Sequence, residues 1–291
     1  MITIGLTTFS EHPSLIDGAK RKVRLTEYSG YFPVVELDTP FYAIPKVEVI
    51  TNWQKQVPDN FQFILKANRV MTMHDQGSAD PVDNEQRFVA FNEYKRAVAP
   101  LMDTGQLKAI LFQFPPYFAR KIATIQYLRR ISQLMAGYPV AVEFRNSTWY
   151  GDEITDDVAG YLSELGMTLV AVDEPHTTNA GVPFEPLVTT ENLALLRLHG
   201  RNVKGWTEQS ADWRGKRTLY RYSEEELAAF RKVVLDLDKQ AKEVCVIFNN
   251  NSGGDAADNA LQLKKMLGIE FGGLSPVRAS TSFPWWHYGR F

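Results

Sequence analysis

The sequence predicts a single TIM-type (β/α)8 barrel, on the basis of its length, its alternating pattern and one missing motif. Eight short apolar runs that resemble strands alternate with segments of helical periodicity along most of the 291 residues. Such alternation is typical of a parallel sheet covered on both faces, and α/β barrels run to about 250 residues as one domain. The first strand-to-helix turn carries no glycine fingerprint for a dinucleotide, which favours the barrel over an open doubly wound sheet.

The expected strands are apolar runs that end at polar residues or at proline. Pro115 and Pro116, for example, stop the fourth strand. The eight expected strands are Thr3–Thr7, Val34–Asp38, Phe61–Ala67, Leu107–Phe114, a run starting with Val140–Val142, Met167–Asp173, Leu193–His199 and Val244–Asn250.

The expected helices follow from apolar spacing and from capping residues. Ser223 with Glu226 three positions later fits a capping box, and Gly166 fits the position just after a helix. The link between strands six and seven is rich in Thr, Pro and Gly, so we expect an irregular barrel with a poor helix there. The expected helices are Pro45–Trp53, Asn84–Leu101, Ile122–Met135, Ile154–Leu165, one starting at Ser223 and Ala256–Leu267, with weaker helical character over Lys20–Tyr31.

Composition is that of an ordinary globular chain, with 44% hydrophobic residues and a formal net charge of -2. This charge gives no support to a nucleic-acid-binding surface, and one cysteine, Cys245, allows no intrachain disulfide. The opening MITIGLTTF lacks signal-peptide features, and no apolar run reaches the ~20 residues that span a bilayer. We therefore expect a cytoplasmic protein with one domain over residues 1–268. An aromatic tail over residues 269–291 would pack on the barrel or mediate homo-oligomer formation.

Polar side chains gather at the carboxyl ends of the expected strands. Alternate residues of a strand share one face, and on each strand one parity is polar while the other is apolar. We expect the polar parity to face the barrel interior and to form a pocket at the carboxyl end, where barrel active sites lie. On the sixth strand this parity is Leu169, Ala171 and Asp173, and the apolar parity that should face the helices includes Val170 and Val172. Each polar residue alone has an ordinary structural explanation, but many of them at one mouth indicate a site.

These residue types predict acid–base chemistry on a small phosphorylated, carboxylated or polyol substrate, by a hydrolase, lyase or isomerase. Arg145 and Arg197 would clamp an anion, because a guanidinium fits carboxylate and phosphate oxygens. Glu143 or Glu36 would be the general acid or base and His199 the second proton-transfer group, with Asp173 as a further carboxylate. The expected substrate-binding residues are Asp38, Lys66, His74, Gln113, Arg145, Trp149, Arg197, Asn249 and Asn250.

Two other functions remain open. Carboxylates with His74 and His199 could hold a divalent metal ion for phosphoester hydrolysis, possibly at a nucleic-acid end, although no tight ligand spacing such as H-x-x-x-H exists. No other cofactor motif is evident. Alternatively, the aromatic segment from Trp206 to Tyr222 and the WWHY tail could stack a base or sugar in a binding protein without turnover.

Several motifs resemble those of the YecE-like family, domain of unknown function 72. They are VELDTPFYAIP, FQFILKA with a later T-x-H, ILFQFPP, AVEFRNSTW, LLRLHGR and VIFNNNSGGDAADNA, in order over residues 1–268. The resemblance implies a TIM-type barrel with these motifs around one pocket, and it implies no established reaction. The chain departs from the family pattern at Gly5–Thr8, at Asp38 where Asn is usual, and at Asn146 where His is frequent.

Overall fold

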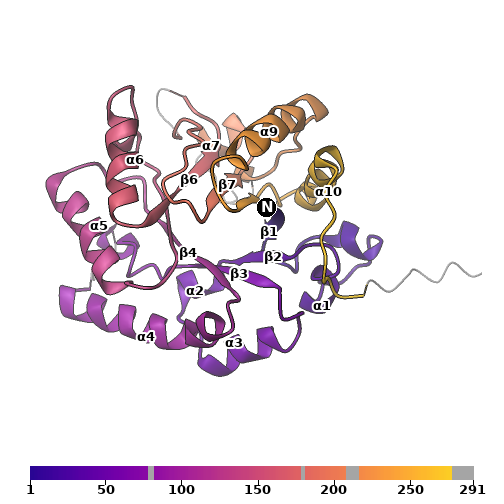
Figure 1. The fold of residues 1–291 in the computed structure, drawn as a ribbon, viewed down its shortest axis with the longest axis horizontal. Coiled ribbons are helices and arrows are strands. Elements are labelled where there is room, and N and C mark those ends of the chain that lie inside the picture. The colour runs from indigo at the N-terminus through magenta and orange to yellow at the C-terminus, as the bar shows by residue number, and fades with distance from the viewer. Residues whose placement is uncertain (78–81, 178–180, 208–215, 277–291) are drawn as a thin grey trace, which may run out of the picture.

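Eight parallel strands close into a barrel in sequence order, as predicted. The computed structural model describes residues 1–77, 82–177, 181–207 and 216–276, and the helices surround the strands (Figure 1). β1 pairs with both β2 and β8, which closes the sheet. The strands are β1 (Ile2–Thr7), β2 (Val34–Leu37), β3 (Gln62–Lys66), β4 (Leu107–Gln113), β5 (Val140–Glu143), β6 (Met167–Asp173), β7 (Ala194–Leu198) and β8 (Val244–Phe248).

The longer helices lie where periodicity predicts them, within about two residues at each end. The helices are α1 (Leu25–Tyr28), α2 (Thr39–Tyr42), α3 (Val47–Gln54), α4 (Asn84–Asp103), α5 (Ile122–Leu134), α6 (Ile154–Glu164), α7 (Val203–Thr207), α9 (Glu224–Leu237) and α10 (Asp255–Leu267). Short 3-10 turns add η1 (Pro13–Ile16), η2 (His74–Gly77) and η3 (Ser147–Trp149). Between β6 and β7, the described residues 174–177 and 181–193 contain no helix, so the irregular connection is confirmed.

The predicted helix ends are stabilised as their sequences indicate. The Ser223 hydroxyl accepts from the Glu226 N–H at 3.3 Å, and the Ser223 N–H donates to the Glu226 carboxylate at 2.9 Å, so the capping box of α9 is confirmed. Gly166 follows α6 with a φ of 67°, a left-handed conformation that glycine adopts without steric cost. None of the described helices is long and apolar enough to cross a membrane.

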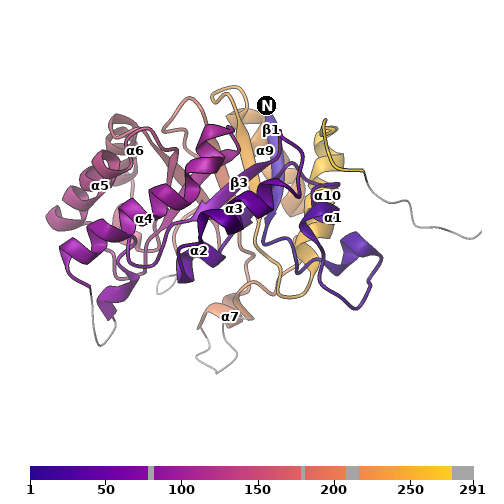
Figure 2. The same cartoon turned by 90° about the horizontal axis from the view of Figure 1, so that it is seen from below.

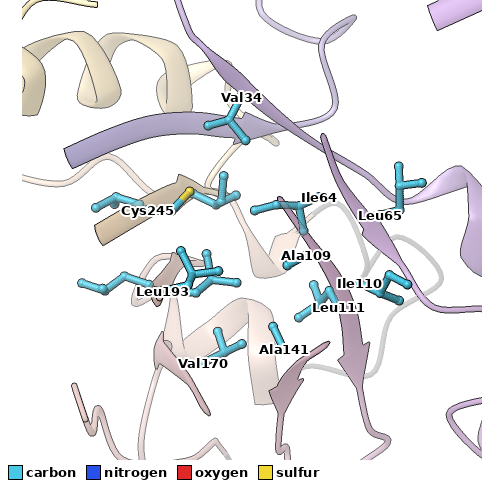
Figure 3. Packing of buried hydrophobic residues seen from close by; sticks show 14 of the residues in the cluster. Val34, Ile64, Leu65, Ala109, Ile110, Leu111, Ala141, Val170, Leu193 and Cys245 are labelled. Atoms are coloured by element: carbon cyan, nitrogen blue, oxygen red, sulfur yellow. The ribbon is translucent and has the colours of Figure 1, made fainter. Parts of the chain in front are cut away.

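The middle of the barrel interior is filled with apolar side chains. Ile64, Leu111, Ala141 and Cys245 belong to this layer (Figure 3), and all four are fully buried. Gly5 is required where β1 meets β2, because a Cβ there would lie 2.3 Å from the Val34 carbonyl oxygen. Such a packed interior leaves the carboxyl ends of the strands as the place for a cavity.

The register of β6 contradicts the predicted facing of this strand. Ala141 of β5 pairs with Thr168, and Arg197 of β7 pairs with Val172. Neighbouring residues in a parallel sheet face the same side, so Thr168, Val170 and Val172 face the barrel interior. The prediction for β6 is wrong because both faces of this strand are largely apolar and buried. The alternation of residue types therefore does not show which face points to the barrel interior.

The first part of the predicted C-terminal tail lies against the barrel. The Ser275 N–H donates to the Ser29 carbonyl oxygen at 3.0 Å, beside α1. Phe271 packs against the core. The aromatic end of the tail, residues 284–291, lies outside the described residues.

Candidate active site

A cavity of about 1140 Å³ opens at the carboxyl ends of the strands. This is the end at which TIM-barrel enzymes build their active sites, and the volume suits a small molecule. Strand ends and the loops after them supply its wall. Of the predicted site residues, the cavity wall contains Asp38, Lys66, His74, Gln113, Arg145, Arg197, His199 and Asn249.

Arg197 lies at the floor of this cavity and binds two buried glutamates. Its Nε and Nη2 donate to the two oxygens of Glu36, at 2.7 and 2.5 Å, and its Nη1 donates to Glu143. All three side chains are at most 1% exposed. The sequence therefore predicts correctly that β2, β5 and β7 bring these three charged groups together. The three groups form ion pairs with one another.

Arg145 extends this network toward the cavity. Its Nε donates to Glu143 Oε1 at 2.5 Å, and its Nη1 donates to Glu174. Glu174 comes directly after β6, on the parity that faces the interior, and its Oε1 also accepts from the Val182 N–H at 3.0 Å. The indole ring of Trp206 on α7 lies 5.4 Å from the guanidinium carbon of Arg145. Helix α7 extends away from the barrel at the same end (Figure 2). The site is thus a chain of three carboxylates and two guanidiniums, which we call the ion-pair chain.

His199 is held at the centre of the ion-pair chain as a neutral ring. Nη2 of Arg145 and Nη1 of Arg197 lie 3.0 and 3.3 Å from its Nε2. Guanidinium groups only donate, so Nε2 accepts and the ring proton sits on Nδ1. The Asn249 Nδ2 atom lies 2.6 Å from Nδ1, so the amide has to be flipped for its oxygen to accept the proton on Nδ1. Burial, together with the two arginines, lowers the pKa of His199 to about 3.

The environments of the two carboxylates that contact Arg145 push their pKa values apart. Burial raises the pKa of Glu174 to about 7, although Arg145 opposes this shift. Burial acts in the same sense on Glu143, but Arg145 and Arg197 outweigh it and hold the pKa of that carboxyl well below its usual range. Burial also raises the pKa of Glu36. A carboxyl group that titrates near neutrality beside one that stays ionised is typical of acid–base sites.

The opposite wall of the cavity carries Asp38, Lys66, His74 and Gln113. The Lys66 ammonium lies 4.0 Å from Asp38 Oδ1, beyond hydrogen-bonding distance, and 4.6 Å from the centre of the Phe41 ring. His74 Nδ1 contacts the Thr72 hydroxyl at 2.8 Å. Burial lowers the pKa of His74 to about 4, so this ring is also neutral.

Besides the buried Glu36 and Glu143, three predicted site residues do not line the cavity. Asp173 faces away from the barrel interior, and its carboxylate accepts from Arg201 and from the Tyr222 hydroxyl, both at 2.7 Å. The Asn250 amide donates to the Tyr220 carbonyl at 2.9 Å and to Asn259 at 2.9 Å, because consecutive residues after β8 point to opposite sides.

Trp149, the third of these residues, is part of the core. Its ring stacks on Phe144 with centroids 4.1 Å apart, and its Nε1 donates to the Phe118 carbonyl oxygen at 2.7 Å. The structure thus places Asp173, Asn250 and Trp149 outside the cavity, and each of the three makes contacts within the protein instead.

Sequence reasoning missed Glu174 and Arg217 in the cavity wall, and it considered Trp206 only as a stacking residue of a binding protein. Glu174 could have been found from its position directly after β6, had the facing of that strand been known. Trp206 and Arg217 come from the long segment after β7, where no periodicity predicts an orientation. Among the residues that the structure describes, no three His, Cys, Asp or Glu side chains are grouped so that they could hold a metal ion.

Comparison with known proteins agrees with the resemblance seen in the motifs. The family model described as "Protein of unknown function DUF72" matches residues 3–283. The chain belongs to the DUF72 family. The UPF0759 protein YunF of Bacillus subtilis is 40% identical over 280 residues, which cover 95% of this chain and 98% of YunF. The UPF0759 protein YecE of Escherichia coli K12 is 41% identical over 66 residues, 23% of each chain.

Solved structures of DUF72 proteins share the whole fold. A DUF72 family protein from Enterococcus faecalis is 40% identical, with a TM-score of 0.88 over 96% of this chain and all of that one. Another from Thermotoga maritima is 30% identical, with a TM-score of 0.76 over 92% of this chain and all of that one. The descriptions of these DUF72 relatives state no reaction, so the function has to be argued from the site.

Proposed function

We propose that this DUF72 protein is an enzyme that performs acid–base chemistry on a small polar substrate in the barrel cavity. The observation that carries the proposal is the contrast between Glu174 and Glu143, two carboxyl groups bound to the same guanidinium of Arg145. Burial raises the pKa of Glu174 to about 7, whereas Arg145 and Arg197 hold the pKa of Glu143 well below its usual range. General acid catalysis needs a group whose pKa lies near the working pH.

Glu174 is the proton-transfer group in this proposal. All three glutamate side chains are fully buried, but Glu174 borders the cavity, whereas Glu143 and Glu36 are not among its lining residues. Glu143 is a positioning residue, because it holds Arg145 and its negative charge helps to raise the pKa of Glu174. His199 is a poor base in this proposal, since burial and the two arginines lower its pKa to about 3 and both ring nitrogens are engaged.

Conversion of small metabolites tests the proposal. Wild-type protein is incubated with a panel of polyols, sugar acids and sugar phosphates, and 1H NMR follows the appearance of a product. Glu174→Gln removes the titrating proton with little change of shape, so it should lose conversion by a factor of at least ~10². Glu164→Gln, at an exposed position of α6, is the matched control and should retain it.

Two results would contradict the proposal. Equal turnover by Glu174→Gln and wild-type protein would exclude Glu174 as the proton donor. Ligand binding by wild-type protein without conversion of any compound in the panel would instead favour a binding protein.

A further inference from the structure

The cavity has two walls that differ in how their polar groups are satisfied. On the β5–β7 side, Arg145 and Arg197 are already bound to Glu36, Glu143 and Glu174. An incoming anion would have to compete with these buried carboxylates for the guanidiniums, and buried ion pairs are strongly destabilising to break. The predicted arginine clamp is therefore a poor place for a phosphate or carboxylate group.

The β2–β4 side carries polar groups that the described part of the chain leaves without hydrogen bonds. Asp38 Oδ1 has no hydrogen-bond partner there, and the contacts of the Lys66 ammonium are the Phe41 ring and Asp38 at 4.0 Å. Gln113, at the end of β4, makes no side-chain hydrogen bond to described residues and belongs to the same wall. Buried or partly buried polar groups normally have partners, so these groups indicate where a ligand supplies them.

We propose that the substrate is an unphosphorylated polyhydroxy compound whose neighbouring hydroxyl groups bind between Asp38 and Lys66. This inference rests on the proposed function, because it concerns the same cavity. One hydroxyl donates to the Asp38 carboxylate and the adjacent hydroxyl accepts from the Lys66 ammonium, so a vicinal diol satisfies both groups at once. Gln113 offers a further donor and acceptor for a third hydroxyl.

Charge and shape at this wall favour a neutral ligand. Asp38 and Lys66 cancel each other, and a phosphate bound to Lys66 would lie close to the Asp38 carboxylate and be repelled by it. His74, at the edge of the Phe41 ring with centroids 4.8 Å apart, adds no charge. The exposed Tyr42 ring, also part of the cavity wall, provides an apolar surface for the C–H groups of a polyol.

Binding measured without turnover tests this inference. Titrations followed by NMR and calorimetry use xylitol, sorbitol and D-glucose as polyol probes, with inorganic phosphate and acetate as anionic probes. At least one polyol should bind at millimolar concentrations, and neither anion should compete with it. Asp38→Asn and Lys66→Met should each weaken polyol binding about ten-fold or more, because each removes a hydrogen bond to a charged group.

Matched variants separate the subsite from a general change of charge. Asp59→Asn and Lys55→Met make the same chemical changes at exposed positions and should leave binding unaltered. Asp38→Asn is nearly isosteric, so it keeps the test valid should Lys66→Met fold poorly, which thermal unfolding would reveal.

The results that would overturn this inference differ from those that would overturn the proposed function. Preferential binding of phosphate or acetate, absence of binding by all three polyols, or unchanged polyol affinity in Asp38→Asn would refute the polyol subsite. Polyol binding that persists in Glu174→Gln, with no turnover by wild-type protein, would refute the proposed function alone. Turnover restricted to phosphorylated compounds would refute the subsite alone.

Discussion

Replacing Glu174 by Gln should change the pH dependence of stability in a way that can be calculated from the site. Burial raises the pKa of this carboxyl from 4.5 to about 7. A shift of one pKa unit corresponds to about 1.4 kcal/mol, so the folded state disfavours the ionised form by about 3 kcal/mol. Below pH 4.5 both the folded and the unfolded chain are protonated at this position, and the group contributes no difference.

The sign of the effect follows from which state ionises first. Between pH 4.5 and 7 the unfolded chain releases the proton while the folded chain keeps it, so wild-type protein loses stability as the pH rises, and above pH 7 the loss is complete. Glutamine cannot ionise and avoids this loss. The difference in unfolding free energy between Glu174→Gln and wild type should therefore increase by about 3 kcal/mol between pH 4.5 and 8.

Urea denaturation at a series of pH values measures this difference. The slope of the difference is the informative quantity, because the amide also alters the hydrogen bonds to Val182 and Arg145 by an amount that does not depend on pH. Glu164→Gln, on the surface of α6, should change stability by less than about 0.5 kcal/mol at every pH. A constant difference between Glu174→Gln and wild type across the range would refute the raised pKa and the role built on it.

Three further predictions concern the residues around this carboxyl. Arg197→Met should destabilise the fold by about 3–5 kcal/mol in urea denaturation, because it leaves Glu36 and Glu143 buried without their cation, whereas exposed Arg130→Met should have little effect. In 15N NMR spectra, His199 should stay neutral with its proton on Nδ1 at any pH above about 5, since its pKa is about 3, and an imidazolium signal at pH 6 would contradict this. Tyr222→Phe should cost about 1–3 kcal/mol, because it removes a hydrogen bond from buried Asp173, but it should leave ligand binding intact if Asp173 is structural.

The barrel and the gathering of charge at its mouth could be predicted from sequence because both follow from local patterns. Strands buried on both faces appear as short apolar runs, and their polar ends mark the carboxyl side of the sheet. The facing of β2, β5 and β7 was readable because Glu36, Glu143 and Arg197 alternate with apolar neighbours. On these strands the period-two pattern and the tertiary environment agree.

The errors arise where the sequence pattern of a strand does not show which face is interior, or where a loop determines the direction of a side chain. β6 is apolar on both parities, so the polar Asp173 was assumed to mark the interior, whereas pairing with β5 and β7 makes Thr168 and Glu174 the inward positions. Asn250 follows Asn249 and therefore points to the opposite side, and Trp149 lies in η3, where a turn replaces strand alternation. Only the register of the closed sheet could correct the facing of β6.

The ion-pair chain is better explained by function than by stability. Replacing buried ion pairs by apolar residues of similar volume is often neutral or stabilising, and the layer of Leu111 and Ala141 below shows that apolar packing fills this barrel. What the chain achieves is to fix Arg145 and His199 and to connect the protonation of Glu174 to the position of Arg145. Arg145 opposes the effect of burial on Glu174, so the position of this guanidinium sets how far the pKa of that carboxyl is raised. A buried network with this property places a titrating carboxyl beside the cavity, which an apolar floor could not provide.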